Sequence, residues 1–346
     1  MYSLFFPHEV YCGIDSLDKI FSKDYSQVLI ISDSEPFAVF SAAQQIHSSF
    51  NSILTEAQLI TSQNPENLFK QAYAYANKEM PECVIAVGSG FVQDCAAAVS
   101  RITETPYISV VSTAPTHLYE YNTLDVFLYK KMPDICILDP VFITNADSLS
   151  LAYDALGMMT LALEAAICAD ERFVIALAQK AFIEIYRNIM PAFRGEISAR
   201  ENLCGAMYGA YTAYVNSGNY SWESAAYRTA SFFSDFSGSK LRVLAVCIPY
   251  LSEHYCEIKP QSFARLAMFA EPDAQKEIAA QMLLKNIRRI QATLAFPSSM
   301  KNYSVKETDF LVFSESLSVE EKDFYFQCYY GNVNFVKKDT INSLLD

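Results

Sequence analysis

The segment Cys83–Ser100, CVIAVGSGFVQDCAAAVS, constrains the fold of this chain more than any other stretch. An apolar run at residues 83–87 ends at the glycine turn Gly88-Ser89-Gly90, and a helical pattern begins at Phe91. This order is typical of a central parallel strand that continues into its crossover helix. Such a turn exposes backbone N–H groups at a helix N-terminus, where the helix dipole favours an anion such as a phosphate. A plain strand-to-helix turn without a ligand fits two glycines equally well.

Apolar runs before and after this segment predict further strands of the same sheet. A short extended segment at the N-terminus precedes Gly13. The predicted strands lie at residues 28–32, 53–59, 107–112 and 135–138. Strands that alternate with helices indicate an α/β fold with a doubly wound parallel sheet. Ligands of such sheets bind at the carboxyl ends of the strands, where Asp33, the glycine turn and Ser112-Thr113 would converge.

The composition changes after Pro140, and from Asp147 to about Leu294 the pattern is helical almost throughout. Breaks are expected at Pro191, Gly218 and Gly238. The sequence therefore predicts two domains, an α/β domain of dinucleotide-binding type at residues 1–146 and an all-α domain at residues 147–346.

The overall charge and composition exclude several classes of function. The 26 basic and 39 acidic side chains give a net charge of −13, which argues against binding to nucleic acid or to an anionic membrane. We see no apolar stretch long enough for a membrane span and no signal-like start, so we expect a cytoplasmic protein. The nine cysteines lack CxxC spacing and are expected to be reduced thiols.

Eight stretches in the right order carry a resemblance that covers nearly the whole chain. They are VLIISD (28–33), NPENLFKQAYAYA (64–76), VIAVGSGFVQDCAAAVS (84–100), PYISVVST (106–113), ICILDPVFIT (135–144), ALGMMTLALEAAI (155–167), ISARENLCGAMYGAYTAYVNSG (197–218) and FPSSM (296–300). The chain resembles the dehydroquinate synthase-like superfamily, and within it the iron-containing alcohol dehydrogenases and glycerol dehydrogenases. The resemblance implies NAD or NADP, a divalent iron or zinc, a small-molecule ligand in an interdomain cleft, and a homo-oligomer, most often a dimer.

The resemblance implies that this chain keeps part of the family's cofactor site. The matching positions are Asp33 near the adenosine ribose, Gly88, Ser89 and Gly90 at the pyrophosphate, and then Asp94, Ser112 and Thr113. Phe91 stands where the family usually has a small or polar residue, and its bulk could block a phosphate. Asp33 would repel a ribose 2′-phosphate, so NAD is favoured over NADP.

The family's metal site does not carry over. Glu164 matches a glutamate of the family, and seven residues earlier Gly157 stands at the position of the first metal ligand, an aspartate. Leu161 stands at the histidine position of the alcohol dehydrogenases. We therefore expect no divalent metal. His117 matches an acidic residue beside the substrate in glycerol dehydrogenases, and is a candidate general base or a loop histidine without a role.

Two hypotheses follow from these residues. In the first, the chain is a diverged glycerol or alcohol dehydrogenase-like oxidoreductase that uses NAD or NADP on an alcohol or polyol CH–OH group, with the metal site lost. In the second, it is a non-catalytic protein that keeps the scaffold to bind a nucleotide or another ligand, or to assemble with a partner.

Overall fold

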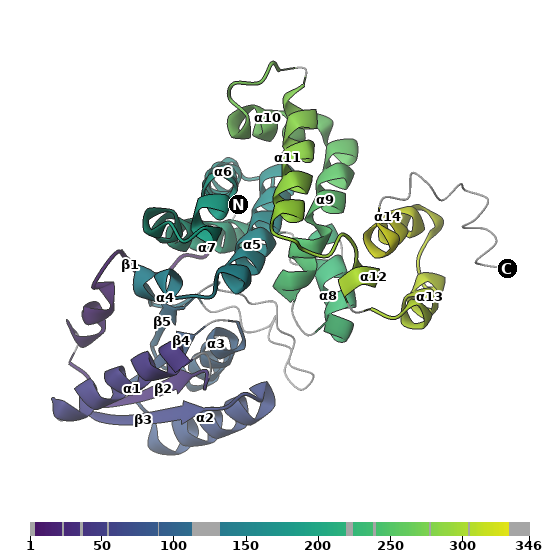
Figure 1. The fold of residues 1–346 in the computed structure, drawn as a ribbon. Coiled ribbons are helices and arrows are strands. Elements are labelled where there is room, and N and C mark those ends of the chain that lie inside the picture. Colours follow the sequence, from purple (N-terminus) through teal and green to yellow (C-terminus); the bar gives the residue numbers. More distant parts are fainter. Residues whose placement is uncertain are drawn as a thin grey trace. The chain divides into compact units, whose positions relative to one another are not determined.

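The computed structural model shows a parallel α/β sheet at the N-terminus followed by many helices (Figure 1). It describes residues 4–22, 24–34, 37–53, 55–88, 90–112, 132–218, 224–237, 240–276, 278–303 and 305–331.

The sheet has six parallel strands in the order β1-β6-β5-β4-β2-β3. The strands are β1 (Glu9–Cys12), β2 (Gln27–Ser32), β3 (Glu56–Thr61), β4 (Cys83–Gly88), β5 (Tyr107–Val111) and β6 (Ile135–Leu138). The predicted fold class is confirmed. The extended lead before Gly13 forms an edge strand, because Cys12 pairs with Leu138 of β6. The predicted strand at residues 53–59 begins later, because helix α1 (Phe37–Ser52) extends up to Ser52 and Ile53 is 56% exposed.

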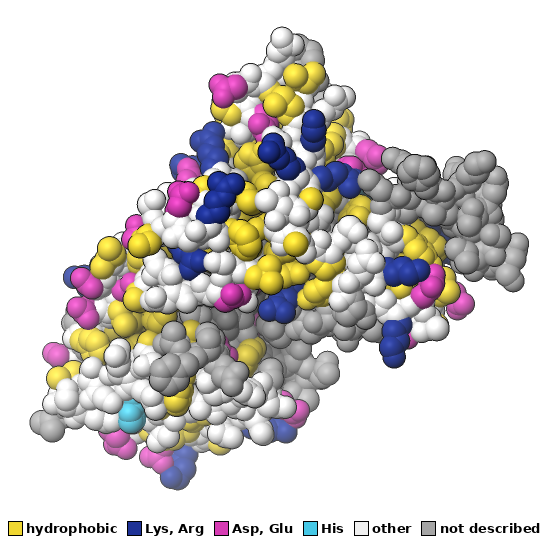
Figure 2. Space-filling model, viewed as in Figure 1, with side chains coloured by type: hydrophobic (Ala, Val, Ile, Leu, Met, Phe, Trp, Pro, Cys, Tyr) yellow, Lys and Arg dark blue, Asp and Glu magenta, His cyan; other side chains and the backbone are white. Residues whose placement is uncertain are grey.

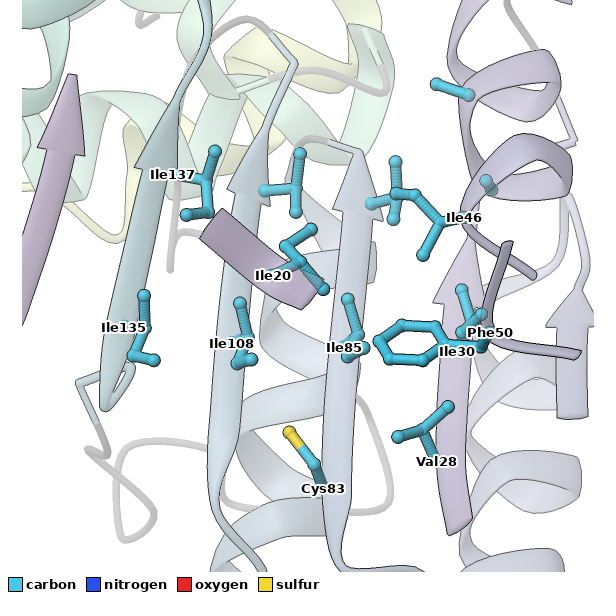
Figure 3. Packing of buried hydrophobic residues seen from close by; sticks show 14 of the residues in the cluster. Ile20, Val28, Ile30, Ile46, Phe50, Cys83, Ile85, Ile108, Ile135 and Ile137 are labelled. Carbon is cyan, nitrogen blue, oxygen red and sulfur yellow. The ribbon is translucent and has the colours of Figure 1, made fainter. Parts of the chain in front are cut away.

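Helices cover both faces of the sheet. Alternate residues of β2, β4, β5 and β6 point to one face, where they pack with Ile46 and Phe50 of α1 and with Ile20 of the 3₁₀ helix η1 (Ser16–Ser22) (Figure 3). On the other face, α2 (Pro65–Glu79) and α3 (Phe91–Thr103) pack on Leu29, Ile31 and Val84. Because both faces are covered, the central strands read as continuous apolar runs in the sequence.

Helix α2 illustrates how local sequence sets an element. The Asn64 side chain accepts a hydrogen bond from the Asn67 N–H at 2.9 Å, and Pro65 occupies the first turn. Leu68, Ala72 and Ala76, spaced four residues apart, are all buried. The start at Asn64-Pro65-Glu66 and this inward face were both predicted correctly.

The rest of the described chain is helical. The helices are α4 (Pro140–Thr144), α5 (Ser148–Cys168), α6 (Arg172–Phe193), α7 (Ile197–Asn216), α8 (Ala225–Ser237), α9 (Lys240–Ile258), α10 (Pro260–Ala270), α11 (Ala279–Thr293), α12 (Met300–Tyr303), α13 (Glu307–Glu315) and α14 (Val319–Tyr330). The break expected at Pro191 falls at residues 194–196, between α6 and α7, and Pro191 itself lies inside the last turn of α6.

Contacts divide the chain into two compact units, Met1–Leu151 with Arg187–Thr212, and Ala152–Tyr186 with Ala213–Asp346. The first unit therefore includes part of α7. One cause is Arg200, whose buried guanidinium donates to the carbonyl oxygens of Thr144 and Ala146, both at 2.8 Å, beyond the end of α4. The predicted division at residue 146 is not decided by this grouping and stays a prediction.

Charged side chains of both signs are interspersed over the face seen in Figure 2. Among the described residues, α5 alone is long and apolar enough to span a membrane, and 83% of its most apolar window is buried inside the structure. The sequence pattern had predicted no stretch long and apolar enough for a membrane span. Burial of this kind is typical of a core helix.

Candidate functional site at the carboxyl ends of β2 and β4

The candidate site lies where the direction of strand addition reverses. The chain runs from β2 outward to β3 and then returns to add β4 on the other side of β2. Asp33 follows β2 directly and is 8% exposed, and Gly88 ends β4. Ligands of open α/β sheets bind at such a switch point, outside the carboxyl ends of the strands.

Asp33 and Gly88 are in close contact. A Cβ atom built on Gly88 would lie 2.6 Å from Asp33 Oδ2, so the Asp33 carboxylate would have to move to make room for it. The Gly88 φ angle of +152° also lies outside the range that other residues readily adopt. Glycine at this position therefore lets the backbone at the end of β4 approach the Asp33 carboxylate.

The glycine turn leads directly into α3. Gly90 is the N-cap residue with φ of +47°, and its carbonyl accepts the first helical hydrogen bond from the Asp94 N–H at 3.2 Å. As a glycine, this cap supplies no side chain to the first N–H groups of the helix. Those groups and the helix dipole favour an anion at this end of α3.

Phe91, which the sequence marked as an obstacle, belongs to the apolar packing of this helix. It is partly buried, and its side chain packs against the cluster that α2 and α3 form on the sheet. Asp94 in the same turn is fully buried inside the unit. Burial, followed by the charge of Asp94, raises the pKa of the neighbouring Cys95 thiol, which therefore stays protonated.

Ser112 joins the ends of β4 and β5. Its N–H donates to the Gly88 carbonyl oxygen at 3.1 Å, and its side chain is buried. The structure therefore brings together Asp33, Gly88, Gly90 and Ser112, while Ser89, Thr113 and His117 lie outside the described residues.

Gln93 is a residue of this region that the sequence alone did not indicate. Its buried amide bonds to the carbonyl oxygens of Gly88 and Val110 and to the hydroxyl groups of Tyr107 and Ser109. No helical or strand pattern marks it, because its partners lie on two strands, 5 to 17 residues away in the sequence.

In the second unit, Gly157 of α5 lies in tight contact with α9. A Cβ atom on Gly157 would lie 2.6 Å from the Leu241 carbonyl oxygen and 2.9 Å from Leu241 Cβ. One turn later, the Thr160 hydroxyl bonds to the Leu156 carbonyl at 2.9 Å and to the Leu244 carbonyl at 3.3 Å. Leu161 is buried beside them. This part of α5 therefore packs tightly on α9.

Glu164 lies one turn further along α5 and caps another helix. Its Oε2 accepts hydrogen bonds from the Ser224 hydroxyl at 2.9 Å and from the Ala226 N–H at 3.2 Å, in the first turn of α8. Burial raises the pKa of this carboxyl to about 7, although these hydrogen bonds oppose the rise. Burial and the charge of Glu164 raise the pKa of Tyr255.

Comparison with known proteins agrees with this architecture. A family model described as iron-containing alcohol dehydrogenase matches residues 14–117. The 1,3-propanediol dehydrogenase of Citrobacter freundii is 24% identical over 273 residues, which cover 69% of this chain and 70% of that protein. The NADPH-dependent butanol dehydrogenase of Clostridium saccharobutylicum is 20% identical, with 98% of this chain and 96% of that protein covered.

A solved structure, the NADH-dependent butanol dehydrogenase A of Thermotoga maritima, superimposes with a TM-score of 0.76 at 16% identity, over 95% of this chain and 99% of that one. The chain is thus a distant homologue of iron-containing alcohol dehydrogenases. The parallel-sheet domain followed by a mostly helical domain is the arrangement of alcohol dehydrogenase structures of this family.

The resemblance to this family implies a divalent metal, and the residues at the matching positions do not fit one. Of Gly157, Leu161 and Glu164, only Glu164 has a ligating side chain, and its carboxylate is bonded to the start of α8. Within the described ranges, no three His, Cys, Asp or Glu side chains are grouped so that they could hold a metal ion. A zinc or iron site needs at least three such ligands.

Proposed function

We propose that this chain is an alcohol dehydrogenase-like oxidoreductase that binds NAD at the carboxyl ends of β2 and β4 and has lost the metal site of its family. The observation that carries the proposal is the contact between Asp33 and Gly88 at the topological switch point. It combines an acidic side chain, suited to ribose hydroxyl groups, with a glycine that permits close approach of a pyrophosphate.

The first turn of α3 supports the placement of the pyrophosphate. Its N–H groups follow the two glycines with positive φ, Gly88 and Gly90, and have no capping side chain from Gly90. A bound dinucleotide would supply the hydride-accepting ring, while the residues of this chain would bind and orient it. Asp33 would disfavour the additional phosphate of NADP.

The close packing at Gly157 supports the loss of the metal site. An aspartate there would place its Cβ within 3 Å of the backbone and side chain of Leu241. The chain would therefore have to bind and orient an alcohol without a Lewis acid. His117 remains the candidate for proton transfer.

The same packing favours a second function, in which the protein binds a nucleotide but performs no redox chemistry. Both functions predict NAD binding, and they differ in turnover. A screen of small alcohols and polyols with NAD⁺, followed by NADH absorbance, separates them.

The proposal is tested by a thermal-shift titration with NAD⁺, NADH and NADP⁺, each with and without Zn²⁺ or Fe²⁺. A ligand that binds only the folded state stabilises it by about 2.7 kcal/mol at a hundredfold excess over Kd, which a melting curve resolves. We expect a larger shift with NAD⁺ or NADH than with NADP⁺, and the same shift with and without metal. No shift with any dinucleotide would contradict the proposal.

A further inference from the structure

We infer that Gln93 is the residue that positions the dinucleotide-binding turn, by holding the carboxyl ends of β4 and β5 against the first turn of α3. This inference rests on the proposed function, because it assigns Gln93 a role in NAD binding. Gln93 would touch the protein backbone rather than the dinucleotide, so it is a positioning residue and not a catalytic one.

The hydrogen bonds of the Gln93 amide are complete. Its Nε2 donates to the carbonyl oxygens of Gly88 at 2.9 Å and Val110 at 3.1 Å. Its Oε1 accepts from the Tyr107 hydroxyl at 2.5 Å and the Ser109 hydroxyl at 2.7 Å. A primary amide has two N–H donors and one oxygen with two lone pairs, so all of its capacity is used.

These bonds fix the orientation of the amide. The carbonyl oxygens of Gly88 and Val110 can only accept, so they require the amide NH₂ group. The hydroxyl groups of Tyr107 and Ser109 donate to the amide oxygen. Burial keeps the pKa of Tyr107 well above its usual value, so its hydroxyl stays protonated and donates. With Gln93 only 2% exposed, water is poorly placed to replace any of these four partners.

The position of Gly88 depends directly on this network. Its carbonyl oxygen accepts from Gln93 Nε2 and from the Ser112 N–H, while its α-carbon faces the Asp33 carboxylate. Gln93 is also in the first turn of α3, whose N–H groups face the expected pyrophosphate. One side chain thus connects the two strand ends to the helix that would hold the anion.

A purely structural role for Gln93 would make a different prediction. In that case its loss would lower stability without a specific effect on NAD affinity. The chain offers a matched control in the second unit, where buried Gln291 donates from Nε2 to the Val246 carbonyl oxygen at 2.8 Å. Each leucine substitution, Gln93→Leu or Gln291→Leu, removes a buried side-chain amide that donates to backbone carbonyl oxygens.

The test measures NAD⁺ binding by calorimetry for the wild-type chain, Gln93→Leu and Gln291→Leu, with thermal unfolding of each. We expect both variants to unfold at lower temperature, and only Gln93→Leu to bind NAD⁺ at least about tenfold more weakly, the scale set by losing a buried hydrogen-bonding partner. If Gln93→Leu does not fold, Tyr107→Phe removes one donor to Gln93 Oε1 and is expected to weaken NAD⁺ binding about threefold.

A second variant, Gln93→Glu, should make NAD⁺ affinity depend on pH, an effect that general destabilisation does not produce. In Gln93→Glu, an ionised carboxylate would face the carbonyl oxygens of Gly88 and Val110, while a protonated one could donate to one of them. NAD⁺ affinity of this variant should fall by about tenfold or more as the pH rises from about 6 to 8, relative to the wild-type chain.

The results of these titrations distinguish a failure of the proposed function from a failure of the role inferred for Gln93. A wild-type chain that does not bind NAD⁺ would overturn both the proposed function and this inference. A wild-type chain that binds, together with equal affinity of Gln93→Leu or an equal loss in Gln291→Leu, would overturn the role of Gln93 alone.

Discussion

Gly88 and Gly157 both stand where a Cβ atom would come within 2.6 Å of another atom, but the two sites differ in what fills the space. At Gly88, the neighbour is a carboxylate oxygen of Asp33, at the end of a sheet where ligands bind. At Gly157, the neighbours are the backbone and side chain of Leu241 on a packed helix. Glycine therefore allows a carboxylate to lie close to the backbone in the first unit, and allows two helices to pack closely in the second.

Under the proposed function, this contrast separates a retained dinucleotide site from a lost metal site. The first unit has charge and backbone donors where NAD is proposed to bind. In the second unit, Gly157 packs on Leu241 and Glu164 caps a helix, at positions that the resemblance matches to the metal site.

The largest effect is expected from Gly157→Asp, which restores the family's ligand type. We expect it to lower the free energy of unfolding by about 3 kcal/mol or more, because it combines overpacking with a buried, unpaired carboxylate. Urea denaturation measures the change. Gly205→Ala is the control, because its Cβ would meet only Cys12 Sγ at 4.0 Å, and it should stabilise the helix by about 0.5–1 kcal/mol. A stable Gly157→Asp variant that gains a Zn²⁺-dependent thermal shift would show that the metal site can still form.

Glu164 should make the stability of the protein depend on pH. Burial raises its pKa from 4.5 to about 7, so the folded state binds the proton more tightly than the unfolded chain does. The resulting stabilisation is complete below about pH 4.5 and is lost as the pH rises through 7, a change of about 3 kcal/mol. Glu164→Gln keeps an acceptor for Ser224 and Ala226 without this titration. Urea unfolding of both proteins from pH 5 to pH 8 should give diverging curves, and parallel curves would contradict the assignment.

On the other side of the comparison, Gly88→Ala should abolish the NAD⁺-dependent thermal shift. The new methyl group would overlap the Asp33 carboxylate, and the positive φ would add strain of about 1–2 kcal/mol. Gly195→Ala is a matched control, because Gly195 also has positive φ, at +92°, but no atom lies within 4 Å of its Cβ position. It should lose stability and keep the NAD⁺ response. Retention of that response in Gly88→Ala would place the dinucleotide elsewhere.

The smallest effect is expected from Asp33→Asn, which changes the charge and little else. NAD⁺ should bind about tenfold more weakly, since hydrogen bonds to a charged group contribute about 1.5–3 kcal/mol. The ratio of NAD⁺ to NADP⁺ affinity should fall as well, because the repulsion of the 2′-phosphate is removed. Calorimetric titrations with both dinucleotides measure this ratio, and an unchanged ratio would exclude Asp33 from the ribose site.

The sequence predicted the features that depend on local pattern. The apolar runs at Val28–Ser32 and Cys83–Val87, and the cap at Asn64, each act within a few residues, so their strands and helix were found. The sequence could not reveal that the lead before Gly13 pairs with β6, since the register depends on a partner more than a hundred residues away.

Side-chain contacts that depend on how the strands and helices pack were also missed. Gln93 is a buried polar residue of α3, but its role depends on carbonyl groups at the ends of two strands. Gly157 was recognised as an absent ligand, whereas the tight contact with Leu241 required the packing of α5 on α9. The sequence shows which residue stands at a position, and the structure is needed to show what that residue packs against.

The central claim is that NAD binding persists in this chain without a metal. The most direct measurement is calorimetric titration of NAD⁺ into the protein as purified and after EDTA treatment, with the metal content of both samples determined by mass spectrometry. We expect equal Kd values and far less than one metal ion per chain. A stoichiometric metal in the purified protein, with NAD⁺ binding lost on chelation and restored by Zn²⁺ or Fe²⁺, would contradict the claim.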